Sequence, residues 1–273
     1  MQIALVGCGF VSDFYMNTIK HYPQLELNTV YDKDKKRLEK FKNFYSVRGE
    51  ESLEKILNNK NVKLIINLTN PSEHYKVIKS CLKHNKHVYT EKPLGMNFKE
   101  AKELFNLAKS KKIKLASAPC SVLSVASQTV QKALLEKKIG KVKLVYANFD
   151  AGMTHKFNLS SWKNPSGAYW PALDEFKTGC TYEHAGYFLT WLHSFFGDAY
   201  KVHAYSKCLF PDKGVGSKMI SHVEKQAMSD GCSLVEVTSA THRAEGGTHT
   251  FYHQLGYRNA VNETTYFRKN LGK

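Results

Sequence analysis

The sequence predicts an α/β protein whose first part is an open parallel sheet. Over residues 1–121, short apolar runs alternate with helical patterns, which is typical of right-handed βαβ units. The first run is continuously hydrophobic, like strands buried inside a parallel sheet. The pattern of apolar residues changes near residue 122 and again near residue 213. We therefore expect a parallel-sheet domain at 1–121, an α+β domain at 122–212 and an α/β tail at 213–273.

In the first domain the apolar runs predict strands at Gln2–Val6, Leu25–Tyr31, Val62–Asn67, Lys86–Thr90 and Lys114–Ala118. The first strand runs through a glycine loop into a helix. A later helix is predicted by apolar residues that recur at helical spacing and form one face, namely Ala101, Leu104, Phe105 and Ala108.

The later segments are less regular. In the middle part we expect a helix at Ser127–Lys137, a strand at Lys141–Asp150, a loop over about 151–178, an aromatic helix at Cys180–Phe196 and a strand at Val202–Phe210. In the tail we expect a helix opened by Gly214-Val215-Gly216, a strand at Cys232–Ser239, a short helix at Thr250–Leu255 and a strand at Thr264–Asn270.

Composition and charge exclude several classes of protein. The chain has 273 residues, 42% of them hydrophobic, and no apolar run approaches the roughly 18 residues of a membrane helix. Its start predicts a buried strand rather than a signal peptide. The net charge is +16. Residues 213–273 carry 8 basic and 5 acidic side chains, so the positive excess has much the same density there as in the rest of the chain. We therefore expect a solvated basic surface and neither a nucleic-acid nor a membrane partner.

The six cysteines form no CxxC pair and no Cys/His metal spacing. We expect reduced thiols, no bound metal and a cytoplasmic location.

The glycine loop Gly7-Cys8-Gly9-Phe10-Val11-Ser12 follows the first strand. Its two glycines permit a tight turn and let a pyrophosphate approach bare backbone at a helix N-terminus. Ser12 replaces the third glycine of the usual pattern, and its hydroxyl could cap the helix. These features predict a dinucleotide site.

Asp32 ends the second strand, where a carboxylate would accept the ribose hydroxyls of an NAD-type cofactor. It would also repel a 2′-phosphate, whereas Lys33, Lys36 and Arg37 could attract one. NAD is favoured, and NADP stays open.

Three motifs together resemble the Gfo/Idh/MocA oxidoreductases over residues 1 to about 212. They are Ala4-Leu5-Val6-Gly7-Cys8-Gly9, Asn67-Leu68-Thr69-Asn70-Pro71-x-x-His74 and Glu91-Lys92-Pro93-Leu94. The resemblance implies a Rossmann-type domain followed by a substrate domain that is truncated here. It also implies that the cofactor is lined by Asn67, Thr69, Asn70, Pro71, His74 and the Glu91-Lys92 turn.

The same resemblance implies an activity, namely transfer of hydride between NAD or NADP and a hydroxyl of a small sugar, polyol or cyclitol. Lys92 would point into the cleft near the nicotinamide and the substrate hydroxyl, where an ammonium group could hold the oxygen or take part in proton transfer. A cis Lys92–Pro93 bond is also implied.

Family members present an Asp and, four residues later, a His on the helix matching Cys180–Phe196. Here those places hold Glu183 and Tyr187, which share a helix face. Tyr187 could act as an acid or base if Lys92 lowers its pKa. His184 is a secondary candidate, about 100° round the helix.

The tail resembles the second half of a GNAT-type N-acetyltransferase. The likeness lies in Lys213-Gly214-Val215-Gly216-Ser217, Leu234–Thr238, His242-Arg243, Phe251-Tyr252-x-x-Leu255-Gly256-Tyr257 and Tyr266–Leu271. It implies a glycine loop for the pyrophosphate of coenzyme A, with Tyr252 as the acid for its thiolate.

The amino-terminal half of that acetyltransferase fold is missing here. Acetyl transfer from acetyl-CoA therefore stands as an alternative, as does a non-catalytic nucleotide-binding protein. Relatives of the first domain associate through a large sheet that is mostly missing here, so no oligomer is predicted.

Overall fold

The computed structural model describes residues 1–148, 154, 157–203, 234–238, 253, 258–259 and 266–270. The chain divides into two compact units, residues 1–199 and residues 200–273.

The first unit is built on a five-stranded sheet with the order β2-β1-β3-β4-β5. All four strand pairs are parallel. The strands are β1 (Gln2–Val6), β2 (Glu26–Tyr31), β3 (Leu64–Asn67), β4 (His87–Thr90) and β5 (Leu115–Ser117). Each lies within a predicted strand, so the Rossmann-like parallel sheet is confirmed.

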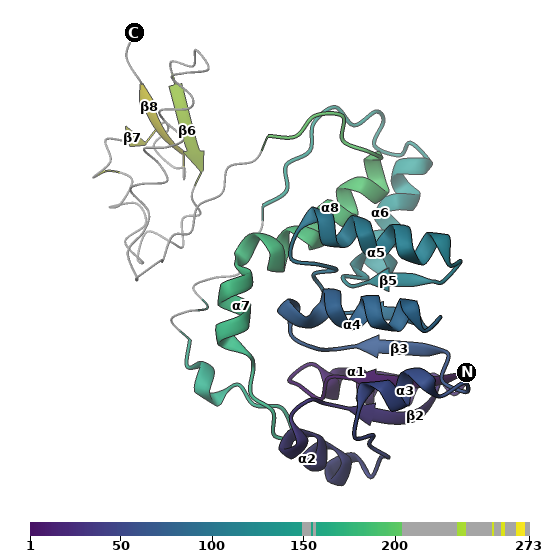
Figure 1. Ribbon diagram of the computed structural model, residues 1–273. Helices are drawn as coiled ribbons and strands as arrows, with labels where there is room; N and C mark the ends of the chain where they lie inside the picture. Colours follow the sequence, from purple (N-terminus) through teal and green to yellow (C-terminus); the bar gives the residue numbers. More distant parts are fainter. Residues whose placement is uncertain are drawn as a thin grey trace. The chain divides into compact units, whose positions relative to one another are not determined.

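Helices flank the sheet (Figure 1). The helices of the first unit are α1 (Ser12–Ile19), α2 (Lys35–Tyr45), α3 (Leu53–Asn58), α4 (Pro71–Lys83), α5 (Phe98–Ser110), α6 (Val125–Leu135), α7 (Ala172–Thr178) and α8 (Cys180–Phe196), with 3₁₀ turns at Ser121–Leu123 and Leu159–Ser161. Several N-termini are capped by residue types that favour this position. The side chains of Asp34, Ser52 and Asn97 accept backbone N–H groups, and Pro71 occupies the first turn of α4.

Strand β1 separates two apolar clusters, because successive side chains of a strand point to opposite faces. Ile3 and Leu5 pack in a cluster with Phe41 of α2. Ala4 and Val6 pack in the other cluster, together with residues of α3, α4 and α5. Both faces of the sheet are thus covered. The ends of the strands form an edge beyond which α7 lies (Figure 1).

Several predictions about the first unit were wrong. Phe105 is 59% exposed, because the buried face of α5 centres on Leu104 and Ala108. No strand forms over the described residues 141–148 of the segment predicted as Lys141–Asp150. Leu144 and Tyr146 are exposed there, and no partner strand is paired with their backbone among the described residues.

The loop predicted over about 151–178 contains α7, whose acidic first turn favours a helix. Helix α8 has the predicted bounds. Val202 and His203 are not in a strand, and the rest of the strand predicted at Val202–Phe210 lies outside the described residues.

The described part of the second unit is a three-stranded antiparallel sheet with the order β6-β8-β7. Strands β6 (Leu234–Thr238) and β8 (Tyr266–Asn270) lie within predicted strands, and β7 is Arg258–Asn259. The helix predicted after Gly214 lies outside the described residues, as does the one predicted at Thr250–Leu255 apart from His253.

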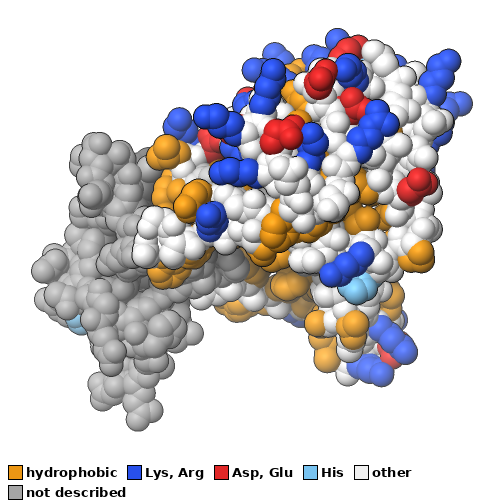
Figure 2. Space-filling view, turned by 90° about the horizontal axis from the view of Figure 1, so that it is seen from below, with side chains coloured by type: hydrophobic (Ala, Val, Ile, Leu, Met, Phe, Trp, Pro, Cys, Tyr) orange, Lys and Arg blue, Asp and Glu red, His pale blue; other side chains and the backbone are white. Residues whose placement is uncertain are grey.

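The charged surface and the helices both bear on the expectations from composition. Figure 2 shows lysine and arginine side chains interspersed with acidic, apolar and other side chains on the viewed face. Within the described ranges, no helix is both long and apolar enough to cross a membrane.

Candidate functional site

The loop after β1 requires glycine at its first position. Gly7 has φ +102°, and a Cβ there would lie 2.6 Å from the carbonyl carbon and oxygen of Leu68. At Gly9 a Cβ would meet no atom within 4 Å. Gly7 therefore lets the first loop pack against the loop after β3, whereas Gly9 leaves open space beside its backbone.

The three residues before α1 carry backbone N–H donors that are not used within the loop. The backbone N–H groups of Gly9, Phe10 and Val11 have no hydrogen-bond partner among the residues that the structure describes. They stand at the N-terminus of α1, where the helix dipole favours an anion. An anion of pyrophosphate size is the group that such a loop recognises.

Ser12 does not cap the helix as predicted. It is the first residue of α1, and the cap position is Val11, which makes no side-chain capping bond. The Ser12 hydroxyl instead donates to the carbonyl oxygen of Gly9 at 2.5 Å. Ser12 therefore fixes the shape of the loop.

Asp32 is buried directly behind the loop. Its Oδ2 accepts a hydrogen bond from the Cys8 N–H at 2.9 Å and one from Arg37 Nη1 at 3.3 Å, and its Oδ1 accepts from the Asp34 N–H at 2.8 Å. Its carboxylate thus holds the glycine loop against the end of β2. Further acceptor capacity remains, since each carboxylate oxygen has two lone pairs.

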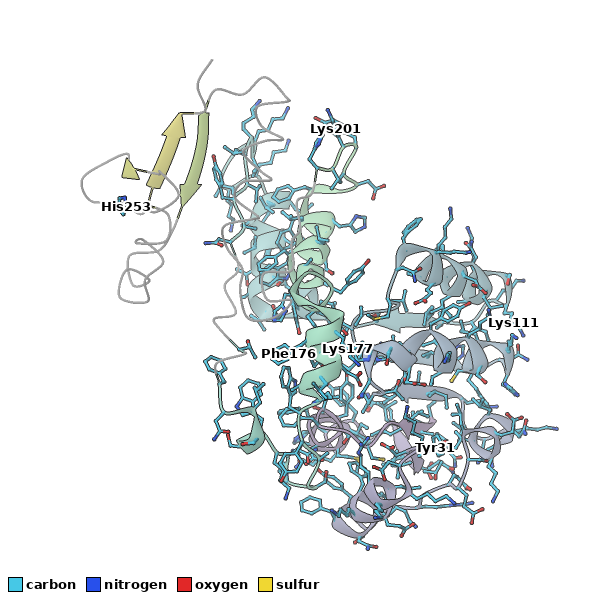
Figure 3. The ribbon with its side chains drawn as sticks, turned by 60° about the vertical axis from the view of Figure 1, so that its left-hand side comes forward. Tyr31, Lys111, Phe176, Lys177, Lys201 and His253 are labelled. Atoms are coloured by element: carbon cyan, nitrogen blue, oxygen red, sulfur yellow. The ribbon has the colours of Figure 1, made fainter. Side chains whose placement is uncertain are left out.

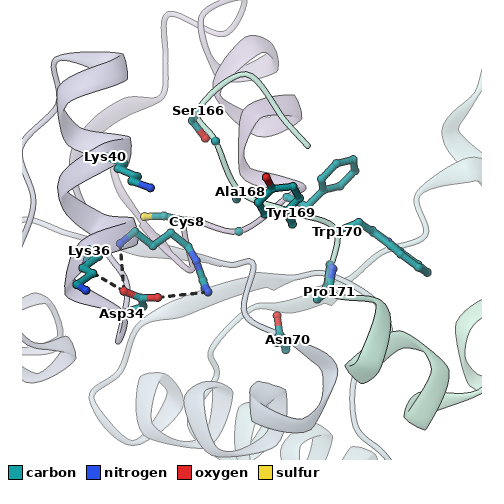
Figure 4. Close-up of a pocket in the computed structure, with 14 residues that line it drawn as sticks. Cys8, Asp34, Lys36, Lys40, Asn70, Ser166, Ala168, Tyr169, Trp170 and Pro171 are labelled. Atoms are coloured by element: carbon teal, nitrogen blue, oxygen red, sulfur yellow. Dashed lines mark hydrogen bonds and ion pairs between the residues drawn. The ribbon is translucent and has the colours of Figure 1, made fainter. Parts of the chain in front are cut away.

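A cavity of about 450 Å³ adjoins the glycine loop (Figure 4). One side is lined by Cys8, Gly9 and Phe10, and the rest by Asp34, Lys36, Arg37, Lys40, Asn70 and residues 166–171. The cavity therefore combines backbone donors, three cationic side chains and the aromatic side chains of Tyr169 and Trp170. An anionic ligand with an aromatic part would fit this lining.

Residues 164–171 form a strap across the loop. Asn164 Nδ2 donates to the carbonyl oxygens of Gly9 and Phe10, both at 3.1 Å, while the Ser166 N–H donates to Asp13 Oδ2 at 2.9 Å. The Asn164 side chain is itself held by the Ala168 N–H, which donates to its Oδ1 at 2.6 Å. Sequence reasoning missed the strap, because no local pattern showed that this loop returns to Gly9.

Aromatic rings join the strap to α7. The rings of Trp162 and Trp170 have centroids 5.3 Å apart, and those of Trp170 and Phe176 are 5.8 Å apart, both in edge-on geometry. Figure 3 shows Phe176 and its neighbour Lys177 on this helix. This aromatic cluster holds the end of the strap against α7.

The loop after β3 is anchored by side chains rather than left open. Asn67 is fully buried, donates to Thr90 Oγ1 at 2.9 Å and accepts from Thr69 Oγ1 at 2.8 Å. Asn70 donates to Asp174 of α7 and also lines the cavity. Of the predicted cofactor residues in this loop, Asn70 is therefore placed to touch a ligand, and Asn67 is placed to hold the loop.

His74 is also fully buried and touches two backbone carbonyls. Its Nδ1 is 2.6 Å from the oxygen of Pro93, and its Nε2 is 2.7 Å from the oxygen of Thr69. Burial lowers the pKa of His74, while hydrogen bonds to these carbonyls oppose the shift. The ring thus links the loop after β3 to the turn that carries Lys92.

Glu91 fixes the start of that turn. Its Oε1 accepts from the Tyr15 hydroxyl at 2.6 Å, and its Oε2 accepts from the Lys92 N–H at 3.1 Å. The Lys92–Pro93 peptide bond is cis, as the resemblance implied.

Lys92 lies between two carboxyl groups. Its Nζ contacts Glu183 Oε2 and is 3.9 Å from Glu175 Oε2. Burial alone would lower the pKa of Lys92, but the hydrogen bond to Glu183 and the charges of Glu183 and Glu175 outweigh it and raise the pKa. Lys92 is therefore an ammonium group at neutral pH. Glu175, on the unpredicted helix α7, was missed by sequence reasoning.

Tyr187 lies one turn beyond Glu183. The charge of Lys92 acts to lower the pKa of Tyr187, as predicted, but burial outweighs this effect, so the pKa is raised overall. The hydroxyl remains protonated at neutral pH and can donate a hydrogen bond. The His184 ring lies beside that of Tyr187, with centroids 6.4 Å apart.

Comparison with known proteins agrees with this geometry. Residues 1–118 match the Gfo/Idh/MocA oxidoreductase family, described as an NAD-binding Rossmann fold. The matched residues span the parallel sheet from β1 to β5.

Two curated relatives illustrate the similarity. The chain is 26% identical over 206 residues to an uncharacterised oxidoreductase of Synechocystis, covering 75% of this chain and 53% of that protein. It is 24% identical over 170 residues to mouse trans-1,2-dihydrobenzene-1,2-diol dehydrogenase, covering 61% and 51%. The chain thus spans about half the length of these relatives.

A solved structure shows the same fold. It is that of a putative NADPH-dependent oxidoreductase from Desulfitobacterium hafniense, with a TM-score of 0.56 and 20% identity, covering 72% of this chain and 55% of that one.

Proposed function

We propose that the chain is an NAD(P)-dependent oxidoreductase that moves hydride between a nicotinamide cofactor and a hydroxyl of a small molecule. The observation that carries the proposal is the placement of two features in the first unit. Unused N–H groups follow β1, and a partly buried ammonium follows β4 of the same parallel sheet. In such sheets, ligands bind beyond the carboxyl ends of the strands.

The residues present fit a dinucleotide. Gly9, Phe10 and Val11 would hold the diphosphate with backbone N–H groups, and the cavity beside them has room for the adenosine part. Asp32 would take the ribose, using acceptor capacity left beside its bonds to the loop. When bound, the nicotinamide supplies the acceptor or donor of hydride.

The catalytic roles fall to the other end of the site. The Lys92 ammonium would hold the substrate oxygen and stabilise negative charge on it as the hydrogen on carbon departs. The Tyr187 hydroxyl, protonated at neutral pH, would orient the same oxygen by a hydrogen bond. Glu183 would fix the direction of Lys92 through their ion pair. His184 supports Tyr187 through ring packing.

The substrate class is proposed from likeness alone. The resemblance implies a sugar, polyol or cyclitol, and one relative's name is that of a dehydrogenase for a cyclic diol. A small polyhydroxylated molecule satisfies both.

The cation-lined cavity bears on the choice of cofactor. Arg37 bonds to Asp32 and Lys36 lies beside it, so either a ribose hydroxyl or a 2′-phosphate would find a partner. Both NAD and NADP are therefore included in the test. The buried free thiols Cys8 and Cys81 support the prediction of a cytoplasmic location.

The test is a thermal-shift and titration series with NAD⁺, NADP⁺ and acetyl-CoA. A dinucleotide that binds only the native state should raise the melting temperature in a concentration-dependent way. Stabilisation together with hydride transfer to a polyol-derived carbonyl supports the proposal. Stabilisation without turnover on any alcohol or sugar would favour a non-catalytic nucleotide-binding protein. The absence of any affinity for NAD⁺ and NADP⁺ would refute the proposal.

A second candidate concerns the tail. We propose it as a coenzyme A-binding segment on the sequence resemblance alone; strands β6 and β8, predicted from the sequence pattern, pair with each other. The glycine loop at 214–216 and Tyr252 lie outside the described residues. Stabilisation by acetyl-CoA tests this candidate separately from the nicotinamide cofactors.

A further inference from the structure

Three ionisable groups gather where α7, α8 and the turn after β4 meet. Lys92 Nζ contacts Glu183 Oε2 and lies 3.9 Å from Glu175 Oε2. The side chains of Lys92, Glu175 and Glu183 are only 23%, 15% and 6% exposed. With all three ionised, the cluster would carry an unbalanced negative charge away from water, which is costly.

The two carboxyl groups are not equivalent. Glu183 is paired directly with the ammonium, and its other oxygen, Oε1, has no hydrogen-bond partner in the described part of the chain. Glu175 is farther from Lys92 and more exposed than Glu183. Lys92 therefore offsets the charge of Glu175 less than that of Glu183, and Glu175 is the carboxyl group that lies nearer to solvent.

The protonation of Glu175 follows from its surroundings. Burial and the neighbouring Glu183 raise the pKa of Glu175 to about 8, against the lowering effect of Lys92. Asp174 on the same helix adds to the increase. Tyr187, from α8, is protonated at neutral pH. Near pH 7, Glu175 is therefore mostly a neutral acid, and the cluster has no net charge.

Resting on the function proposed above, we propose that Glu175 is the residue through which the proton of the substrate hydroxyl leaves the Lys92 site. In the oxidation direction, the carbon-bound hydrogen departs with its electron pair as hydride to the nicotinamide. The O–H bond breaks, its electron pair forms the second bond of the carbonyl, and the proton enters the cluster. It ends on the Glu175 carboxylate and passes from there to water.

The reverse direction uses the same groups. A neutral Glu175 supplies the proton that the oxygen gains when a carbonyl accepts hydride. The substrate is oxidised in one direction and reduced in the other, with the nicotinamide as its partner, so no further oxidant is needed.

This role predicts a pH dependence with a definite sign. Oxidation needs the Glu175 carboxylate, so its rate should rise about tenfold per pH unit below the pKa and level off above it. Reduction needs the acid form and should decline above the same pH. The midpoint should lie near the pKa of about 8.

The variant that tests the role is Glu175→Gln, with Glu51→Gln as the matched control. Glu51 carries the same carboxyl group at a site 84% exposed, where it pairs with Lys55 and takes no part in this cluster. We expect Glu175→Gln to lower kcat/KM for oxidation by about 10²–10⁴-fold and to remove the ionisation near pH 8. Glu51→Gln should keep both the rate and the profile.

A second measurement does not depend on activity. In the ligand-free protein with ¹³C-labelled glutamate carboxyls, one resonance should titrate near pH 8 and should be missing in Glu175→Gln. If that variant does not fold, the wild-type titration and wild-type rate profile decide instead. No ionisation near pH 8 in either would overturn the inference.

The outcomes separate the two proposals. A wild-type chain that binds neither nicotinamide cofactor overturns the proposed function and this inference together. Binding and turnover with an unchanged pH profile in Glu175→Gln overturns only the role of Glu175. A variant that loses stability but keeps the profile likewise reduces Glu175 to packing between α7 and α8.

Discussion

Gly7→Ala should destabilise the first unit, and Gly9→Ala should not. At Gly7 the added Cβ meets backbone atoms, the carbonyl carbon and oxygen of Leu68 at 2.6 Å and the nitrogen of Thr69 at 2.7 Å. Backbone held in place by β3 cannot move aside as a flexible side chain would. At Gly9 the Cβ meets nothing within 4 Å.

The magnitude follows from two costs. Holding an L-residue at the positive φ of Gly7 costs about 1–2 kcal/mol. Forcing extra volume into packed surroundings costs about 1–3 kcal/mol more. Alanine's smaller unfolded-state entropy offsets about 0.4–1 kcal/mol of this. We therefore expect a loss of roughly 2–4 kcal/mol for Gly7→Ala, a large share of the ~5–15 kcal/mol typical of a domain.

Gly9→Ala should instead weaken dinucleotide binding by about tenfold or more, because its methyl group enters the space that a diphosphate must occupy. Urea unfolding followed by tryptophan fluorescence measures the stability of the first unit, since Trp162, Trp170 and Trp191 all lie in residues 1–199. Titration with NAD⁺ and NADP⁺ measures affinity. Equal stability of Gly7→Ala and wild type, or unchanged affinity in Gly9→Ala, would refute the reasoning.

Three further predictions concern the walls of the site. Lys92→Ala should keep dinucleotide affinity but lose about 10²–10⁴-fold in turnover, measured by steady-state kinetics; unchanged turnover would remove Lys92 from catalysis. Asn164→Ala leaves the Gly9 carbonyl without one of its donors, so it should cost about 1–3 kcal/mol in urea unfolding and weaken dinucleotide binding; unchanged affinity would separate the strap from the site. Burial lowers the pKa of His74 in the fold, so as the pH falls the unfolded chain binds a proton before the folded chain does. Wild-type stability should therefore fall as the pH drops below the ordinary pKa of 6.5, and His74→Gln should lessen that fall. Stability-against-pH curves that run parallel for the variant and the wild type would contradict this.

The sheet and its ligand edge could be predicted because local sequence determines them. Short apolar runs predicted all five strands of this sheet, and the glycine loop followed from residue types whose backbone requirements are specific. Asp32 could be found because it directly follows the second strand, whereas Lys92 was found only through the resemblance of its Glu-Lys-Pro motif to the family.

The features that the sequence did not predict depend on contacts between distant segments. The strap at Asn164 joins Gly9 across 155 residues, and Glu175 meets Lys92 only once α7 packs at the edge of the sheet. The pKa of Tyr187 depends on burial as well as on its neighbouring cation, and spacing along a helix reports neither. Asn67 and His74 are fully buried and are held by Thr90 and by the carbonyl oxygen of Pro93, contacts that the sequence pattern did not show.

The most direct measurement is an amide ¹H–¹⁵N titration of the purified chain with NAD⁺ and with NADP⁺. Saturable shifts of the Gly9, Phe10 and Val11 amide resonances are expected, because these N–H groups have no partner among the described residues. Saturable binding that leaves these three resonances unmoved, or no binding of either dinucleotide, would contradict the assignment of this loop as the diphosphate site.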